Sequence, residues 1–535
     1  MKEYIIVAKT EADIDSLHAE LTVNVAANQQ VDKNIIPIRA VGVANARLGN
    51  PRITHYYLTE DEAAKLANDP RVEAIHEPPP ANSKIRHVVQ RSAAYNGVIG
   101  NYNRNGSPDK YNINWGLRRT SVANYETRPG NTYEYDVDGA GVDIIIMDDG
   151  VQVDHPELLD ASGLSRVQQI DWYAVTGIPG TMPSKHYVLD GYGDGEHGTH
   201  VATTVAGKTF GYAKKSRLYS LRIFGATNQA IPEADQFDLI RVFHQNKPVD
   251  PRTGVKRPTI VNMSWGYRWY YDNGNWWNSN LIRSINYRGV NYDFSNSPTS
   301  RKVQYGQVGS THGIHIPSVD AEQQDAEDAG VIFVHSAGNS QHKIDKPGGV
   351  DYGNYYTIGS SFAGIFPPNT PIYYHRGGSP YSQNAITVSA ARDTPAVSNR
   401  RNFEVVDYYS ERGPGCDVVS PGTNICAGTS KVSSYSGQQE YVWGRNNVQD
   451  KSHRVVKISG TSMAAPQVTG VLALYLSRNP AATPAQCKAW IAQTGLKNQV
   501  LSSVINNDWT NANSLLGGPN NFLYNPYRNR YVDKK

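Results

Sequence analysis

One apolar run that ends in polar and small residues constrains the fold of this chain most. The residues from Ile144 to Met147 are all large and apolar, and Asp148, Asp149 and Gly150 follow directly. A continuous run of this kind is typical of a strand buried on both faces of a parallel sheet. Such sheets carry their chemistry at the carboxyl ends of the strands, which makes Asp148 a candidate site residue. The alternative is a strand followed by an ordinary Asx turn.

Apolar strand patterns alternate with helical patterns along the rest of the chain. This alternation predicts an α/β fold with a doubly wound, mostly parallel sheet.

Two further segments place polar side chains at predicted helix starts. His197 follows a glycine-rich approach, and Ser462 stands among small residues ahead of the apolar helical pattern from Val468 to Leu476. A serine hydroxyl is a poor nucleophile alone, but unpaired N–H groups at a helix start favour developing negative charge. Taken singly, each segment has an ordinary interpretation, with His197 as a cap or core residue and Ser462 as a helix cap.

Together the three segments supply an aspartate, a histidine and a serine in the chain order of the subtilisin type of triad. The surrounding motifs are Asp148-Asp149-Gly150, His197-Gly198-Thr199-His200 and Gly460-Thr461-Ser462-Met463-Ala464-Ala465-Pro466. On these motifs the chain resembles the subtilisin-like serine proteases, or subtilases, and within them the proteinase K-like branch. An esterase or lipase would need a Gly-x-Ser-x-Gly elbow and the order Ser, Asp, His, which the observed order excludes.

The resemblance implies a serine endopeptidase that works through an acyl-enzyme. Ser462 would attack the scissile carbonyl, His197 would move the proton, and Asp148 would hold the histidine. The segment from Val334 to Asn339 resembles the family's Ala-Ala-Gly-Asn segment. The Asn339 side chain and the Ser462 backbone N–H would therefore donate to the oxyanion. The alternative for Asn339 is a turn residue.

The same resemblance assigns two segments to substrate binding. The six residues are Ser264, Trp265 and Gly266 on a strand that pairs with the peptide, and Ser336, Ala337 and Gly338 opposite it. Trp265 stands where the family usually has a smaller aliphatic residue, and Tyr267 stands where a second glycine is usual. Both side chains would narrow the non-primed subsites, so the family's broad apolar preference is not carried over.

Residues 1–80 are predicted to form a small separate α+β domain. Strand patterns occur at Tyr4–Ala8 and Ile53–Leu58, helical periodicity covers Asp13–Leu21, and Thr59–Glu62 has a capping-box pattern. This order resembles the inhibitory propeptide of subtilases. The resemblance implies a self-processing zymogen whose propeptide is an intramolecular inhibitor and lies in the cleft until it is cut. The alternative is an accessory binding domain that is never removed.

Residues 81–112 are polar and are predicted to be a linker that contains any maturation cut. The peptidase domain is predicted over 113–527, and 528–535 form a basic tail.

Two stretches inside the peptidase domain, about 267–311 and 341–381, exceed the compact family core. Long loops of this kind are often functional, which favours a lid or an exosite. A self-packed surface insertion is the alternative.

No cofactor is expected for catalysis, and calcium is the structural ion that the resemblance suggests. Asp417 matches a family aspartate that coordinates a cation, with backbone carbonyls near Gln383 and Ala385 as partners. Ligation by oxygen alone suits calcium. The alternative for Asp417 is a turn or a hydrogen-bonded acid. Glu157 matches a carboxylate of the strong calcium site of true subtilisins, but the chain lacks that site's loop, so metal is not expected there.

The composition limits the classes of partner. A formal charge of +3 over 535 residues favours neither nucleic acid nor membrane, and the family resemblance implies a polypeptide substrate. Three cysteines, Cys416, Cys426 and Cys487, do not make a disulfide framework, so buried or free thiols are predicted, with a Cys416–Cys426 pair as the alternative.

The first residues, Met1 to Lys9, do not resemble a secretory signal, because the apolar stretch is short and carries an acid. The expectation is an intracellular protein, for which a virus-encoded or particle-associated protease would fit. The main alternative to an enzyme is a catalytically silent subtilase fold used for binding. Every catalytic position is intact, which favours the enzyme.

Overall fold

The computed structural model describes most of the chain, in several ranges with gaps between them. The described residues are 1–22, 40–47, 49–78, 85–89, 114–123, 135, 137–270, 282–293, 305–306, 311–358, 369–392, 404–443, 448–500 and 515–527. The predicted tail over 528–535 and most of the predicted linker therefore lie outside the described residues. In the described part, no helix combines the length and the apolar character needed to cross a membrane.

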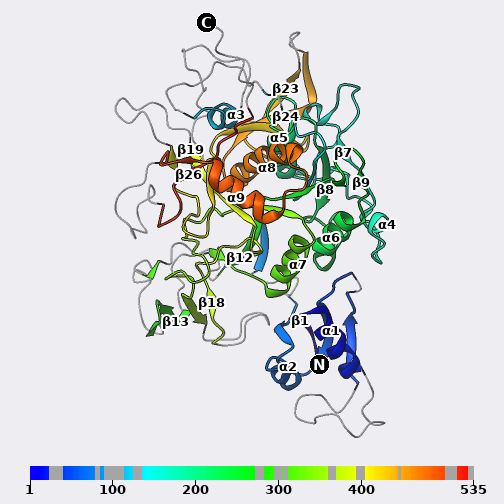
Figure 1. Cartoon of the computed structure of the whole chain (residues 1–535), viewed down its shortest axis with the longest axis vertical. Helices are drawn as coiled ribbons and strands as arrows, with labels where there is room; N and C mark the ends of the chain where they lie inside the picture. The colour runs from blue at the N-terminus through cyan, green and yellow to red at the C-terminus, as the bar shows by residue number, and fades with distance from the viewer. Residues whose placement is uncertain are drawn as a thin grey trace.

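A mostly parallel sheet forms the centre of the molecule (Figure 1). Its strand order is β25-β26-β21-β19-β16-β11-β6-β8-β7, with β20 beside β19. The strands are β6 (Asp143–Asp148), β7 (Val167–Gln168), β8 (Arg217–Arg222), β11 (Thr259–Met263), β16 (Ile332–Ser336), β19 (Ile386–Arg392), β20 (Val405–Val406), β21 (Val418–Pro421), β25 (Leu496–Lys497) and β26 (Asn521–Phe522). The pairs β25–β26 and β19–β20 are antiparallel, and the other neighbours are parallel. The predicted α/β sheet is confirmed.

Helices cover both faces of this sheet because its strands are apolar on both sides. In β6, Ile144 and Ile146 pack with residues of α5 and α8, whereas Ile145 and Met147 pack with residues of α4, α6 and α7. Successive strand residues point to opposite faces, so one short run supplies two cores. The helices are α3 (Trp115–Thr120), α4 (Trp172–Thr176), α5 (Glu196–Ala206), α6 (Gln236–Asn246), α7 (Pro317–Asp328), α8 (Thr461–Arg478) and α9 (Pro484–Thr494), with 3-10 turns at Pro156–Leu158 and Glu233–Asp235.

The two predicted insertions meet in one small sheet of order β14-β13-β17-β18. Its strands are β13 (Ile282–Tyr287) and β14 (Val290–Asp293) from the first insertion, and β17 (Tyr355–Ile358) and β18 (Ile372–Tyr373) from the second. Ile285, Tyr356 and Ile372 are buried in the same core as α6 and α7. The described parts of the insertions therefore pack on each other and on the body, as the self-packed alternative expects.

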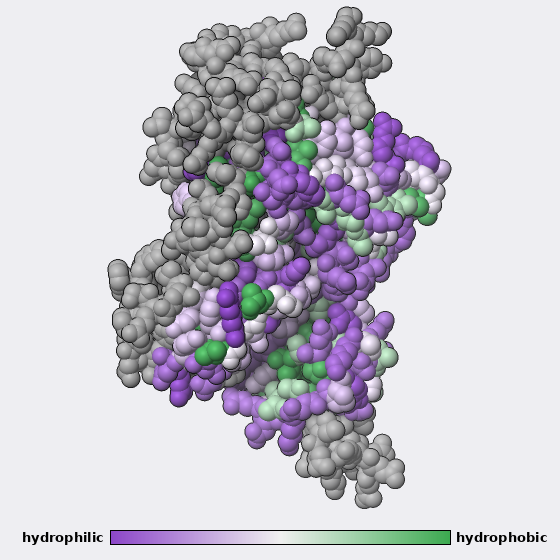
Figure 2. All heavy atoms as spheres, turned by 60° about the vertical axis from the view of Figure 1, so that its left-hand side comes forward, coloured by the Kyte–Doolittle hydropathy of each residue, from purple (hydrophilic) through white to green (hydrophobic). Residues whose placement is uncertain are grey.

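Three smaller groups of strands lie outside the central sheet. Their members are β9 (Val249–Asp250) with β10 (Val255–Lys256); β22 (Ile425–Thr429), β23 (Gln439–Trp443) and β24 (Val448–Ile458); and β5 (Ile85–Val89), β12 (Trp265–Tyr270) and β15 (Thr311–Gly313). In the face drawn in Figure 2, the described surface is mostly hydrophilic, and its apolar residues lie in small separate patches.

The N-terminal segment forms an α+β unit with its own core. Its elements are β1 (Lys2–Ala8), α1 (Glu11–Thr22), β2 (Gly42–Asn45), β3 (Ile53–Leu58), α2 (Glu60–Leu66) and β4 (Val72–His76), and the sheet order is β2-β3-β1-β4. Side chains such as Ile6, Leu17 and Tyr56 are buried together between the sheet and the helices. The predicted capping box at Thr59 is present, with reciprocal hydrogen bonds to Glu62.

Buried ion pairs join this unit to helices α6 and α7, beside which it lies in Figure 1. Arg47 donates to Glu322 at 2.8 Å and to Asp238 at 3.2 Å, and its side chain is only 3% exposed. Arg52 donates to Asp325 at 2.9 Å. One guanidinium thus serves two buried carboxylates, and its loss would leave Asp238 with the longer contact to Arg241, at 3.5 Å, and remove the ion pair of Glu322.

Replacing Arg47 tests this junction. We expect Arg47→Met, in a Ser462→Ala background, to lower the free energy of unfolding by about 3–5 kcal/mol, because removing one partner of a buried ion pair strands the other. Guanidinium unfolding measures the change. Lys2→Met, which removes an exposed pair with Glu60, is the control and should leave stability unchanged. Equal stabilities for Arg47→Met and its parent would contradict the anchoring role.

Candidate active site

Three segments that are far apart in the sequence meet at the carboxyl edge of the central sheet. Asp148 is the last residue of β6, His197 is the second residue of α5, and Ser462 is the second residue of α8. Helix α5 packs against both β6 and α8. The strand end and the two helix starts therefore present these side chains to one place.

Asp148 and His197 form a fully buried pair. The two carboxylate oxygens lie 2.8 and 3.0 Å from His197 Nδ1, and both side chains are 0% exposed. A carboxylate at Nδ1 keeps the proton on that nitrogen and makes Nε2 the basic one. The arrangement suits a histidine that accepts a proton through Nε2.

The start of α8 is fastened to the end of β11 by reciprocal hydrogen bonds. The Ser462 hydroxyl donates to the Ser264 carbonyl at 3.0 Å, and the Ser264 hydroxyl donates to the Ser462 carbonyl at 2.9 Å. Asn262 donates to the Ser264 hydroxyl, and Thr469 donates to Asn262. Asn262 and Thr469 were not predicted as positioning residues. The sequence signal that could have found them is the amide of Asn262, which stands inside the apolar run of β11.

Asn339 lies just beyond β16 and faces the start of α8. Its Oδ1 accepts hydrogen bonds from the backbone N–H and the hydroxyl of Thr461, both at 3.0 Å, so Nδ2 must point the other way. Nδ2 is buried, and no residue in the described ranges accepts its hydrogen bond. A buried donor without a partner is costly, which fits a group that waits for a substrate oxygen.

Gly338 brings the chain into this position. Its φ of +126° lies where side chains are strained, and a Cβ there would come within 2.5 Å of the Glu411 carboxyl carbon. Its backbone N–H donates to the Thr461 hydroxyl at 3.0 Å. The glycine is therefore needed both for the backbone angle and for the space.

The two predicted substrate segments are tied together by Ser379. Its hydroxyl lies 3.1 Å from the Trp265 carbonyl and 3.0 Å from the Ser336 carbonyl, and it is the donor to both. Ser379 was not among the predicted site residues, because the link joins loops that are distant along the chain. Ala337 is also buried, at 1% exposure.

Trp265 and Tyr267 point into the core that contains α6 and α7. The two side chains are 0% and 2% exposed, and their rings meet edge to face. The Tyr267 hydroxyl donates to Glu233 at 2.5 Å. Their substitution for smaller family residues is thus accommodated by packing inside the protein, and the narrowing of the subsites stays a prediction.

Strand β12 already has a peptide segment of the same chain beside it. Strand β5 pairs antiparallel with β12, with Val89 opposite Trp265 and Val88 opposite Gly266. Strand β15 pairs with the other side of β12, from Arg268 to Tyr270, so β12 is the central strand and β5 and β15 are the two edges of this sheet. The backbone of the segment 85–89 thus pairs with the strand that was predicted to bind substrate.

Asp149, next to Asp148, fixes the first turn of α5. Its carboxylate accepts the backbone N–H groups of His197 at 3.2 Å and Gly198 at 2.7 Å. Burial, and then the charge of Asp148, raise the pKa of Asp149 to about 7. Asp149 therefore positions the backbone of His197 and titrates near neutral pH.

The predicted calcium ligands lie together, but a lysine stands among them. Lys488 donates to the Ala385 carbonyl at 2.8 Å and lies 3.2 Å from Asp417 Oδ1. The backbone N–H of Gln383 donates to Gln324. Across the described ranges, no group of three or more His, Cys, Asp or Glu residues has a metal-binding arrangement.

The Glu157 carboxylate accepts hydrogen bonds from backbone N–H groups. Its Oε2 accepts the N–H groups of Thr209 at 2.7 Å and Phe210 at 3.2 Å, which closes the compact loop after α5.

Cys416, Cys426 and Cys487 are buried free thiols, as expected. Burial raises the pKa of each thiol to about 12.

This chain is similar in sequence to a known family and to several known proteins. Residues 139–515 match the model described as "Subtilase family". Over 398 residues the chain is 25% identical to "Subtilisin-like serine protease Cla h 9.0101" of Davidiella tassiana, covering 73% of this chain and 54% of that protein. Over 416 residues it is 24% identical to a "Cuticle-degrading serine protease" of Arthrobotrys oligospora, covering 77% and 68%. The chain thus spans about half the length of the first of these relatives.

Solved structures of similar proteins include a cold adapted subtilisin-like serine proteinase, at 21% identity and a TM-score of 0.43, covering 78% of this chain and 99% of that one. Fervidolysin from Fervidobacterium pennivorans has 17% identity and a TM-score of 0.49, with 97% of this chain and 60% of that one covered.

The titration of Asp149 predicts a pH dependence of stability. Its folded pKa of about 7 exceeds the usual value of about 3.9, so the native state binds the extra proton between these values. Stability from this group is complete below about pH 4 and is lost as pH rises through 7. We expect Asp149→Asn, in a Ser462→Ala background, to flatten the fall of unfolding free energy across this window, by at most about 1.4 kcal/mol per pH unit.

Denaturant unfolding at several pH values measures this slope. Asp154→Asn, which changes an exposed carboxylate of the same segment, is the control and should keep the parent slope. If the unfolding free energy of Asp149→Asn falls with pH as steeply as that of its parent, Asp149 does not titrate in this range.

Proposed function

We propose, because this chain belongs to the subtilase family, that it is a serine endopeptidase with Asp148, His197 and Ser462 as its catalytic triad. The observation that carries the proposal is the buried Asp148–His197 pair beside the start of α8. Nothing in the fold requires a carboxylate and an imidazole to be buried together there, and burying them without a use is costly.

The proposed reaction begins with Ser462. His197 Nε2 takes the hydroxyl proton as the oxygen attacks the substrate carbonyl, and it later gives that proton to the leaving amine. Asp148 keeps the ring in the correct tautomer and stabilises its cationic form. Water then hydrolyses the acyl-enzyme by the same route in reverse, with His197 as base.

Asn339 is proposed as a donor to the oxyanion of the tetrahedral intermediate. Its amide is held by two hydrogen bonds from Thr461, so Nδ2 is oriented before the substrate arrives. A donor fixed in advance costs no reorganisation when charge develops on the oxygen. The Ser462 backbone N–H, at the start of α8, is the second proposed donor.

The substrate is proposed to be an extended polypeptide that pairs with β12. The antiparallel pairing of β5 with the segment from Trp265 to Tyr267 supports this proposal, since it is the same backbone interaction made within the chain. Ser336, Ala337 and Gly338 would line the opposite wall. Cleavage preference would depend on which substrate side chains fit between β12 and this opposite wall.

The N-terminal unit is proposed to be the inhibitor of a self-processing zymogen. Its core, its buried docking to α6 and α7, and the continuation of the same chain into β5 all support this role. A silent binding protein would not need the oriented Asn339 amide, so that alternative is not favoured.

Self-processing predicts a difference in mass between the wild type and Ser462→Ala. Val89 lies opposite Trp265, and the residue before Trp265, Ser264, accepts the hydrogen bond of the Ser462 hydroxyl. The described pairing therefore leads the chain toward Ser462 at Val89, the last residue of β5. We expect the wild type to lose its N-terminal segment by a cut on the carboxyl side of β5, within the predicted linker, and Ser462→Ala to stay whole.

Intact mass spectrometry of the two proteins, purified in parallel, measures the cut. Trimming of Ser462→Ala at the same bond would show that another protease makes it. If both proteins stay whole, labelling with a serine-directed fluorophosphonate tests Ser462 directly, and absence of labelling in the wild type would contradict the proposed activity.

Replacing Asn339 tests the oxyanion role. We expect Asn339→Ala to lower kcat about 100- to 1000-fold with little change in KM, because the lost donor acts mainly on the transition state. Steady-state hydrolysis of a peptide substrate measures both constants. Asn291→Ala, on the exposed strand β14, is the control and should keep the parent kcat. An unchanged kcat in Asn339→Ala would refute the role.

A further inference from the structure

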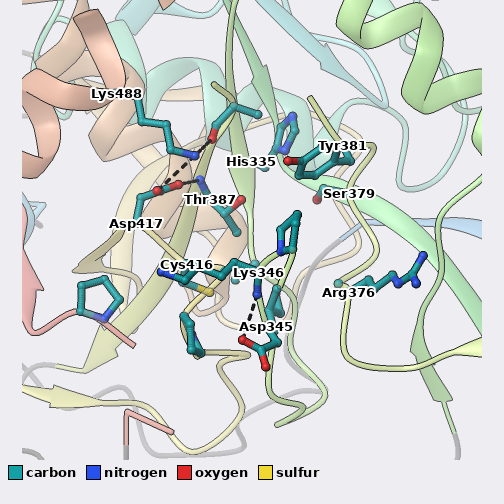
Figure 3. A pocket seen from close by; sticks show the side chains of 18 of the residues that line it. His335, Asp345, Lys346, Arg376, Ser379, Tyr381, Thr387, Cys416, Asp417 and Lys488 are labelled. Carbon is teal, nitrogen blue, oxygen red and sulfur yellow. Dashed lines mark hydrogen bonds and ion pairs between the residues drawn. The ribbon is translucent and has the colours of Figure 1, made fainter. Parts of the chain in front are cut away.

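The segment that resembles a family cation site contains a cation of the protein's own. Lys488, from α9, reaches between two oxygens that were predicted to bind calcium, the carboxylate of Asp417 and the carbonyl of Ala385 (Figure 3). We propose that the Lys488 ammonium takes the place of a calcium ion at this site, so that the site is held without metal. This inference does not depend on Ser462 being catalytic.

The distances suit an ammonium. Nζ donates a hydrogen bond to the Ala385 carbonyl at 2.8 Å and forms an ion pair with Asp417 Oδ1 at 3.2 Å. Calcium lies about 2.3–2.6 Å from each of its oxygens and takes about six to eight of them. An ion that bridged these two oxygens would need the space that Nζ fills.

The remaining oxygen of Asp417 is also satisfied by the protein. Oδ2 accepts the backbone N–H of Thr387 at 2.8 Å, and the Asp417 N–H donates back to the Thr387 carbonyl at 2.9 Å. One positive charge faces one negative charge, and each carboxylate oxygen already has a partner within the protein. The set therefore does not fit calcium while Lys488 is in place.

The ammonium joins elements that border the substrate cleft. Ala385 comes just before β19, Asp417 just before the neighbouring strand β21, and Lys488 from a helix on one face of the sheet. The loop that leads to Ala385 carries Ser379, whose hydroxyl binds the carbonyls of both substrate segments. A cation at this point therefore supports one wall of the cleft, as a bound ion would.

A second lysine occupies a similar environment near Glu157. Lys214 donates to the carbonyls of Lys208 and Gly211, each at 2.8 Å, in the compact loop that replaces the family's other calcium loop. Burial lowers the pKa of Lys214 to about 8, so its charge is weaker near neutral pH. Lys214 therefore places a second ammonium against backbone carbonyls, as Lys488 does at Ala385.

Two variants separate charge from space, and both are made in the full-length Ser462→Ala protein to prevent self-digestion. Lys488→Met keeps a long side chain but removes the charge, and Lys488→Ala also opens the space between the two oxygens. Thermal unfolding is measured with EDTA and with added calcium chloride. We expect the parent Tm to be the same in both conditions, and each variant to lose about 2–5 °C in EDTA.

Calcium should restore part of the Tm of Lys488→Ala but not of Lys488→Met, and the double variant Lys488→Ala/Asp417→Asn should not respond. Lys346→Ala is the control and should behave as the parent, because Lys346 is an exposed lysine that lines the same pocket as Ala385, Asp417 and Lys488. A Lys488→Ala protein that is destabilised but gains no Tm from calcium would contradict the proposal that the ammonium takes the place of a calcium ion. The proposal is overturned if calcium stabilises the parent protein and Asp417→Asn removes that gain. It is also overturned if Lys488→Met has the same Tm as the parent.

Discussion

The reciprocal hydrogen bonds between Ser264 and Ser462 are the interaction on which the site depends. They fix the start of α8 to the end of β11, and each serine is both donor and acceptor through its hydroxyl and its carbonyl. The Ser264 carbonyl belongs to the strand segment proposed to hold the substrate, so one contact would set the proposed nucleophile relative to the peptide. Because parallel strands end at one edge, Asp148 on β6 and Asn339 beyond β16 reach the same place without long loops.

Buried or partly buried charged groups have a partner at each of three places in this protein. Arg47 joins the N-terminal unit to α6 and α7, Asp149 receives two N–H groups of α5, and Lys488 meets Asp417. Desolvation makes each group costly alone, so each contact gives specificity of position more than net stability. The Arg47 contact lies between the N-terminal unit and α6 and α7, the Asp149 contact at the start of the helix that carries His197, and the Lys488 contact behind the proposed cleft wall.

The sequence predicted what short-range patterns control. The apolar run before Asp148 predicted β6 and its polar end, and the capping pattern at Thr59 predicted the start of α2, because both depend on neighbouring residues. The link from Ser379 to two carbonyls and the approach of Lys488 to Asp417 could not be predicted, because they join residues that only the finished fold brings together. The burial of Trp265 could not be predicted for the same reason. Its place in a strand was evident, but the core that receives its side chain is built from α6 and α7.

The pairing of β5 with β12 would link the proposed inhibition to the proposed substrate binding through one physical requirement. Strand β12 presents backbone N–H and C=O groups that need partners, and β15 pairs with only the far part of it. While β5 is present, those groups are satisfied within the chain. Removal of β5 would expose an edge that an extended peptide can complete with the same hydrogen bonds. An inhibitor that pairs in this way needs no shape of its own in the cleft. It only has to be held there, and the buried contacts of Arg47 and Arg52 hold the unit from which it extends.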